Sequence, residues 1–165
     1  MRGNTADIEL RRLTPDEWPL WRSIRLDALS EAPYAFVSTL ADWQGVGDSK
    51  DRWRSRLMDV SFNVVAVLDG SGVGQVSATH LDEFLSVELI SMWVSPQARG
   101  RGVGDALIDA VLGWAADCGA DSVSLAVKST NQHAIALYER TGFVAQGKNP
   151  GAPDERRMQM RIPHI

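Results

Sequence analysis

The sequence feature that most constrains the fold is a strand, a glycine-rich turn and a helix in direct succession over residues 88–107. An apolar run with strand character is broken at Ser95-Pro96, and from Val103 onwards apolar side chains recur at the three- and four-residue steps of a helix. Three glycines mark the transition: Gly100, Gly102 and Gly104. Backbone N–H groups at such a helix N-terminus can face one anion. The stretch therefore predicts either an anion-binding turn or only a tight strand–helix corner.

The spacing of the glycines excludes the two common nucleotide-binding loops. A dinucleotide fingerprint requires G-x-G-x-x-G, but the sixth positions counted from the first two glycines are Asp105 and Leu107. A G-x-x-x-x-G-K-[ST] phosphate loop occurs nowhere in the sequence. The chain instead has an R-x-x-G-x-G motif from Arg99 to Gly104, after a strand expected to end at Val94.

A second motif lies downstream, where residues 131–143 have the pattern N-x-x-A-x-x-L-Y-x-x-x-G-F. The pattern predicts a helix that Ser129 or Thr130 caps and that Gly142 ends. One face of this helix carries Ala134, Leu137, Tyr138 and Thr141. Alone, the pattern is also typical of an ordinary amphipathic helix with a half-buried tyrosine.

Together, in this order and spacing, the two motifs resemble the acyl-CoA-binding signatures of the GNAT superfamily of N-acetyltransferases. The resemblance covers residues 60–147 and is looser in the N-terminal third. It implies a single domain over residues 1–165, with an acceptor-side region at about 14–60 and an acetyl-CoA-binding core at about 61–147. Acetyl-CoA is then a co-substrate, and no metal is expected.

The resemblance also implies how the chain would hold acetyl-CoA. Backbone amides of the glycine turn would bind the pyrophosphate, with these residues involved: Arg99, Gly100, Arg101, Gly102, Val103, Gly104 and Asp105. The pantetheine arm would lie along the strand that ends at Val94, against main-chain groups of Met92 and Val94. Asn131 matches the residue that contacts this arm. Asp105 is unusual, because a carboxylate beside a diphosphate is unfavourable unless it points away.

The periodicity along the chain predicts the fold class. Strands are expected at 8–13, 62–68, 73–81, 86–94, 122–127 and 156–162, and helices after a capping box at Thr14, at 50–58, from 103 and at 131–141. A loop rich in glycine and proline is expected after residues 143–145. The order β-α-α-β-β-β-α-β-α-β predicts an α/β fold with a mixed sheet and helices on both faces. The resemblance implies that the sheet is mostly antiparallel.

Acetyl transfer from a thioester to an amine needs a general acid for the leaving thiolate and a base for the amine. We expect Tyr138 to be the acid, because a phenol is protonated at pH 7 and its helix face is shared with Asn131. The alternative is a hydroxyl that only positions the sulfur.

Glu88 is the expected base, because a carboxylate in an apolar strand is costly without a use and its position matches a glutamate of several family members. Asp82 and Glu83 compete for this role, and His80 and His133 follow them. The region before the second strand would shape the acceptor pocket. There, three acids would suit a cationic amine or simply cover a solvated face: Asp42, Asp48 and Asp51.

Composition narrows the partners. The chain has 17 Lys and Arg against 21 Asp and Glu, and this net charge of -4 argues against nucleic acid. The single cysteine, Cys118, excludes an internal disulfide and a cysteine metal cluster. The first residues lack the apolar run of a signal peptide and no stretch approaches the length of a membrane span, so a soluble, cytoplasmic protein without a membrane partner is expected.

These observations favour an N-acetyltransferase that moves the acetyl group of acetyl-CoA to a primary amine by direct attack in a ternary complex. The acceptor is then a small-molecule amine or an amine of a peptide or protein. The alternative is a GNAT-fold sensor or partner subunit that binds acyl-CoA without turnover. The oligomeric state leaves no signature in the sequence, which permits a homodimer.

Overall fold

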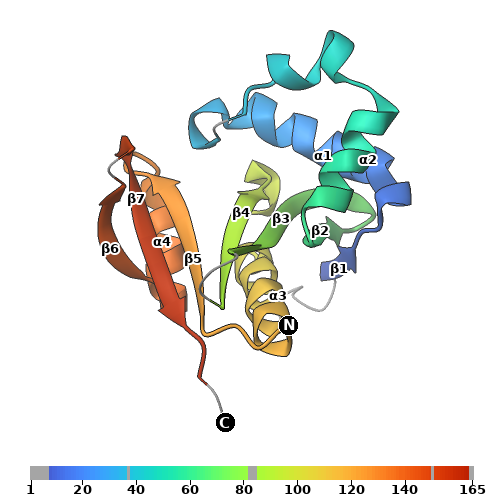
Figure 1. The fold of residues 1–165 in the computed structure, drawn as a ribbon. Coiled ribbons are helices and arrows are strands. Elements are labelled where there is room, and N and C mark those ends of the chain that lie inside the picture. Colours follow the sequence, from blue (N-terminus) through green and yellow to red (C-terminus); the bar gives the residue numbers. More distant parts are fainter. Residues whose placement is uncertain (1–7, 37, 82–84, 150, 164–165) are drawn as a thin grey trace.

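The computed structural model describes residues 8–36, 38–81, 85–149 and 151–163. Its centre is a seven-stranded sheet in the order β1-β2-β3-β4-β5-β7-β6 (Figure 1). The strands are β1 (Ile8–Arg12), β2 (Phe62–Leu68), β3 (Ser71–Leu81), β4 (Ser86–Val94), β5 (Ser122–Lys128), β6 (Val144–Asn149) and β7 (Ala152–Arg161). Neighbouring strands pair antiparallel except β4 and β5, which pair parallel. The predicted mixed, mostly antiparallel α/β fold is confirmed.

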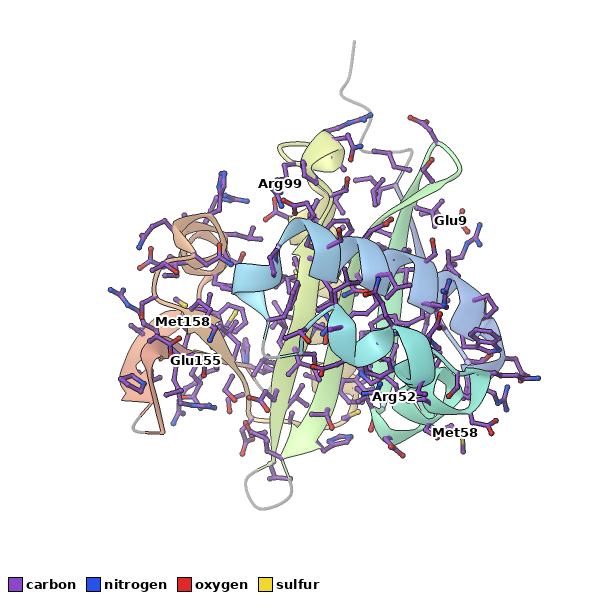
Figure 2. The ribbon with its side chains drawn as sticks, turned by 90° about the horizontal axis from the view of Figure 1, so that it is seen from above. Glu9, Arg52, Met58, Arg99, Glu155 and Met158 are labelled. Atoms are coloured by element: carbon purple, nitrogen blue, oxygen red, sulfur yellow. The ribbon has the colours of Figure 1, made fainter. Side chains whose placement is uncertain are left out.

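Helices cover both faces of the sheet, as expected. Helices α1 (Trp18–Glu31) and α2 (Lys50–Asp59) lie across the central strands on one face, as the view from above shows (Figure 2). Trp21 and Trp53 are fully buried there against residues of β2 and β4. Helices α3 (Val103–Asp117) and α4 (Gln132–Thr141) cover the other face, where Leu107 and Ile108 join the larger core. Burial of β2 on both faces explains why its sequence is apolar except for Asn63.

The predicted turns are present with small shifts. Asp69 and Gly70 both have positive φ, at 52° and 80°, as a two-residue hairpin turn of the primed type requires. Leu68 therefore pairs directly with Ser71, and β3 begins two residues earlier than expected. The capping box of Thr14 and Glu17 is also confirmed, with the Thr14 N–H donating to the Glu17 carboxylate at 2.9 Å. It starts a short 3-10 turn (Pro15–Glu17) that leads into α1.

The expectation of a loop after residues 143–145 was wrong. Strand β6 occupies this part of the chain and forms a hairpin with β7, in which Asn149 pairs with Ala152. Gly147 is tolerated because β6 is the edge of the sheet, and Pro153 is tolerated because it lies near the start of β7, before the pairing with β5 begins at Glu155. The register shift between Ala145 and Lys148 surrounds Gly147, which has a φ of 97°.

Strands β4 and β5 are paired over only part of their length. In the described part of the chain their pairing is confined to Ser86–Glu88 against Ser122–Ser124, and beyond it the two strands diverge (Figure 1). Strand β4 also bulges against β3, because three steps along β4 from Ile90 to Trp93 match two along β3. Ser91 lies in this bulge with a φ of 57°, an unusual value for a residue with a side chain. The divergence leaves the second half of β4 with an open edge.

Candidate active site

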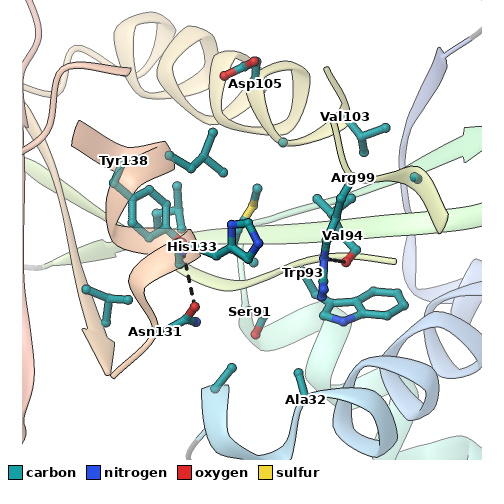
Figure 3. A pocket seen from close by; sticks show the side chains of 18 of the residues that line it. Ala32, Ser91, Trp93, Val94, Arg99, Val103, Asp105, Asn131, His133 and Tyr138 are labelled. Atoms are coloured by element: carbon teal, nitrogen blue, oxygen red, sulfur yellow. Dashed lines mark hydrogen bonds between the residues drawn. The ribbon is translucent and has the colours of Figure 1, made fainter. Parts of the chain in front are cut away.

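A cavity of about 590 Å³ lies where β4 and β5 diverge (Figure 3). It is lined by β4 from Leu89 to Val94, by the turn before α3, by the end of β5 and by α4. Asn131, His133 and Tyr138 lie on one side of it, and Arg99 and Val103 lie on the other (Figure 3). The cavity therefore brings together both sequence motifs, which are about thirty residues apart in the chain.

The glycine turn presents to this cavity backbone N–H groups that have no backbone partner among the described residues. Gly102 is the N-cap of α3 with a left-handed φ of 85°, and it has no side chain with which to cap the helix. The helical hydrogen bonds of α3 begin with the Ala106 N–H, which donates to the Gly102 carbonyl at 3.0 Å. The N–H groups of residues 103–105 therefore precede the helical ladder. At Gly104 a Cβ would come within 2.9 Å of Leu137 Cδ2, so its absence lets α3 approach α4. This arrangement suits a phosphate or diphosphate group.

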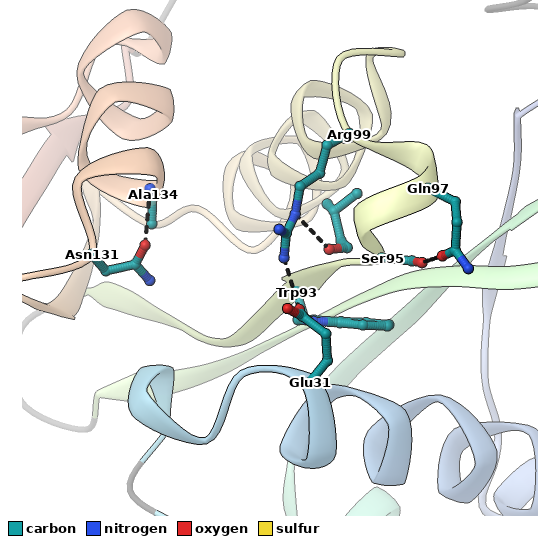
Figure 4. A network of polar contacts seen from close by, with 8 residues as sticks. Glu31, Trp93, Ser95, Gln97, Arg99, Asn131 and Ala134 are labelled. Carbon is teal, nitrogen blue, oxygen red and sulfur yellow. Dashed lines mark hydrogen bonds and ion pairs between the residues drawn. The ribbon is translucent and has the colours of Figure 1, made fainter.

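Arg99 braces the turn as well as lining the cavity. Its Nε donates to the Val94 carbonyl at 3.1 Å, and its guanidinium donates to the Glu31 carboxylate at 2.8 Å (Figure 4). The same carboxylate oxygen accepts from the indole of Trp93 at 2.9 Å. The turn, the end of β4 and α1 are thus joined by one carboxylate. Arg101 is not among the residues that line the cavity. The eight other predicted turn and strand residues all line it, as do Asn131 and Tyr138.

The conflict expected at Asp105 is relieved by a residue that the sequence did not single out. The guanidinium of Arg140, which lies on α4 two residues after Tyr138 and also lines the cavity, donates to both oxygens of the Asp105 carboxylate, at 3.1 and 3.3 Å. Both side chains are partly exposed, so the pair itself contributes little stability. Its effect is to neutralise a negative charge beside the predicted phosphate site. Arg140 occupies a variable position of the second motif, which is why the motif gave no signal for it.

Asn131 and Tyr138 are both carried by α4. The cap of this helix is Asn131, whose side-chain oxygen accepts from the Ala134 N–H at 3.3 Å, so the prediction of Ser129 or Thr130 was wrong. Gly142 ends the helix as expected, with a φ of 121°. Tyr138 is only 5% exposed, and its ring packs edge-on against Phe143 at 5.7 Å between centroids. Burial raises the pKa of Tyr138 above its usual value, so the phenol stays protonated through the neutral range.

Glu88 lines a second cavity of about 440 Å³ on the α1 and α2 side of β4. Six residues line both cavities, which therefore adjoin: Ala35, Phe36, Leu89, Ile90, Ser91 and Ala126. Glu88 is half-buried at the last position where β4 pairs with β5. His133 lines the first cavity, whereas His80 is exposed and stacks on Trp114 outside both. Asp82 and Glu83 lie outside the described residues.

The three acids predicted for the acceptor region do not line this second cavity. Asp48 instead accepts two hydrogen bonds from Arg22, at 2.7 and 2.6 Å, and one from Trp53 at 2.8 Å. These hydrogen bonds, of which those from Arg22 have the largest effect, lower the pKa of Asp48 to about 2. Among the described residues the cavity is instead lined by two arginines that had no signal in the sequence, the buried Arg25 and the half-buried Arg56. Both lie in amphipathic helices, where an arginine gives no local sign of facing inwards.

The part of the chain that the structure describes has neither a metal-binding cluster nor a membrane-spanning helix. No three histidine, cysteine, aspartate or glutamate side chains come together there in a way that could hold a metal ion. None of the described helices is both long enough and apolar enough to cross a bilayer.

Known proteins are similar to this chain in sequence or in fold. The Acetyltransferase (GNAT) family matches residues 16–143. The mycothiol acetyltransferase of Beutenbergia cavernae is 45% identical over 131 residues, which are 79% of this chain and 42% of that protein. The human N-acetylaspartate synthetase is 40% identical over 83 residues, which are 50% of this chain and 28% of that protein. The chain thus spans less than half the length of either relative.

A solved structure has the same fold at low sequence identity. The PaiA N-acetyltransferase from Thermoplasma acidophilum, in complex with coenzyme A, superposes with a TM-score of 0.74 at 15% identity, over 93% of this chain and 98% of that one. This similarity concerns the fold alone, whereas the family match covers residues 16–143, more than half of the 165. Both agree with the two motifs that meet at the cavity. The chain belongs to the GNAT family of acetyltransferases.

Proposed function

We propose that the protein transfers the acetyl group of acetyl-CoA to a primary amine by direct attack in a ternary complex. The observation that carries the proposal is the junction of the two cavities along β4, at residues 89–91. One cavity has the phosphate-binding turn and Tyr138, and the other has Glu88. A donor and an acceptor bound in adjoining cavities would meet at this strand, as direct transfer requires.

The turn and the open edge of β4 support the proposal that the chain binds acetyl-CoA. The N–H groups of residues 103–105 and the positive end of the α3 dipole would hold the pyrophosphate. The pantetheine arm would run along β4 as an additional strand, using main-chain groups of Met92 and Val94. Arg140 would keep the Asp105 charge away from the phosphates. The acetyl-CoA-binding core is therefore proposed to be residues 61–147, and the acceptor-side region residues 14–60.

The side chains then have separate tasks. Acetyl-CoA supplies an activated acetyl thioester. Tyr138 would donate its phenolic proton to the departing sulfur, a role for which its raised pKa keeps the proton in place. Glu88 would accept a proton from the amine, directly or through water, from its position in the second cavity.

The test is to incubate the protein with acetyl-CoA and a panel of amines while thiol release is followed, with a parallel calorimetric titration of CoA. Binding of CoA together with amine-dependent thiol release is the expected result. Tight CoA binding without acetylation of any amine would contradict the transferase proposal and favour an acyl-CoA sensor. Absence of CoA binding would contradict the assignment of the first cavity.

A further inference from the structure

The second cavity contains buried hydrogen-bond donors that have no acceptor within the described part of the chain. Arg25 on α1 is 8% exposed, and its Nη1 has no hydrogen-bond partner there. The Nε1 of Trp21, one turn earlier on α1, is likewise unpaired among the described residues. Both side chains line the cavity. A buried donor without an acceptor costs free energy, so two of them beside one cavity indicate a ligand that accepts hydrogen bonds.

The cavity is also positively charged. Arg56 of α2 lies in it beside Arg25, and neither guanidinium forms an ion pair with a described carboxylate. Burial lowers the pKa of each arginine to about 10, and repulsion from Arg56 adds to the effect on Arg25. Both remain cations at neutral pH. The lining as a whole has four basic side chains and two carboxylates, an excess of two positive charges. A bound anion would offset the cost of burying these charges.

Arg56 places this charge next to the reacting end of the cavity. Its guanidinium donates to the side chains of Asn63, at 2.9 Å, and of Ser77 and Ser91, at 3.2 Å each. Ser91 is the bulged residue of β4 that lines both cavities. Arg56 is therefore held by the sheet, whereas Arg25 is held mainly by stacking on Phe36, at 4.6 Å from the ring centre. Arg25 thus has the donor that a ligand can use.

We propose that Arg25, with Arg56 and the indole N–H of Trp21, binds a carboxylate of the acceptor, so that the acceptor is a small amine that carries a carboxylate, such as an amino acid. The inference rests on the proposed function and names the substrate class of the same site. A guanidinium presents paired donors in the geometry of a carboxylate, which makes arginine suited to this task. The same two charges would repel a polyamine or any other purely cationic acceptor.

The experiment compares amino acids with their α-amides, which keep the amine and lose the carboxylate charge. For the parent protein we expect kcat/KM for the acid to exceed that for the amide by about tenfold to a hundredfold, the effect of charge-assisted hydrogen bonds. In Arg25→Met this ratio should fall towards one, mainly through KM of the acid, while the amide is acetylated at the parental rate. Arg25→Gln repeats the test with a shorter polar side chain. Arg54→Met is the matched control, because Arg54 is a cation of α2 that pairs with Asp16 outside both cavities.

Two readouts do not depend on turnover. Amino acids should change the tryptophan fluorescence of the parent, since Trp21, Trp43 and Trp53 line the cavity, and should do so much less in Arg25→Met. Without ligand, Arg25→Met should melt at the same temperature as the parent or higher, because it removes an unpaired buried charge. An aminoalkyl phosphonate in the same titration separates a carboxylate site from a general oxyanion site.

The results of these experiments distinguish a failure of the proposed carboxylate site from a failure of the proposed transferase function. Equal acetylation of acids and amides would overturn the carboxylate site and leave the transferase proposal intact. Tighter binding of the phosphonate than of every amino acid would overturn the choice of a carboxylate. If no amine is acetylated, the fluorescence titration still decides: an Arg25-dependent response supports the site, and no response to any amino acid overturns it.

Discussion

Replacement of Tyr138 by phenylalanine removes one hydroxyl from the wall of the first cavity and should separate catalysis from binding. Tyr138 is only 5% exposed, and a phenylalanine ring in its place would keep the edge contact with Phe143. The fold should therefore persist, with a loss of stability of no more than about 1.5 kcal/mol. If the hydroxyl donates a proton only as the C–S bond breaks, its loss acts on the transition state and spares the ground state.

General acid catalysis contributes about a hundredfold or more, which corresponds to about 2.7 kcal/mol at the lower end. We expect Tyr138→Phe to lose about two orders of magnitude in kcat while its Kd for CoA stays within about twofold of the parent. Stopped-flow thiol release and a CoA titration on the same preparation measure the two quantities. The active form is the protonated phenol and burial raises its pKa, so kcat of the parent should show no alkaline decline from this group up to pH 9.

A Tyr138→Phe protein with parental kcat would refute the assignment of the general acid. A variant that loses CoA affinity in the same proportion as kcat would show that the hydroxyl positions the donor in the ground state. Circular dichroism excludes misfolding as the cause of either result.

Three other predictions concern the turn, the base and the acceptor region. Gly102→Val forces a β-branched residue into the left-handed region at the N-cap of α3, and it should weaken CoA binding at least tenfold, as measured by calorimetry. The control Gly113→Val, on the open face of the same helix, should bind CoA normally. Equal affinities of the two variants for CoA would show that the turn is not part of the binding site. Glu88→Gln should slow acetylation most near neutral pH and recover in part at high pH, where free amine is abundant, and superimposable pH–rate profiles would make Glu88 structural. Asp48 has a lowered pKa in the folded state, so its contribution to stability is present above about pH 4 and is lost as the pH falls towards 2. Asp48→Asn should therefore melt below the parent at pH 7, with a difference that shrinks between pH 4 and 2; a constant difference would show that its charge is not responsible.

Local patterns were sufficient to predict the strands and helices that carry their own signals. Strand β4 was expected at Ser86–Val94 and is found there, because an apolar run that ends at Ser95-Pro96 has an unambiguous end. The Asp69-Gly70 hairpin and the end of α4 at Gly142 were equally clear, since each requires positive φ values that few residues adopt. Through two motifs that are each local, the sequence also predicted several of the residues that line the first cavity, although Arg101 does not line it and Arg140 was missed. Their catalytic and binding roles remain predictions.

The tertiary structure alone decided how these pieces meet. The divergence of β4 from β5, the Glu31 carboxylate that holds both Trp93 and Arg99, and the pairing of Asp105 with Arg140 join residues from distant segments. The second cavity shows this most clearly. Its acids were expected from the composition of residues 42–51, yet Asp48 is paired with Arg22, and the cavity is lined by arginines of α1 and α2. An arginine in an amphipathic helix has the same local sequence signal whether it faces water or a cavity, and only packing against the sheet determines which.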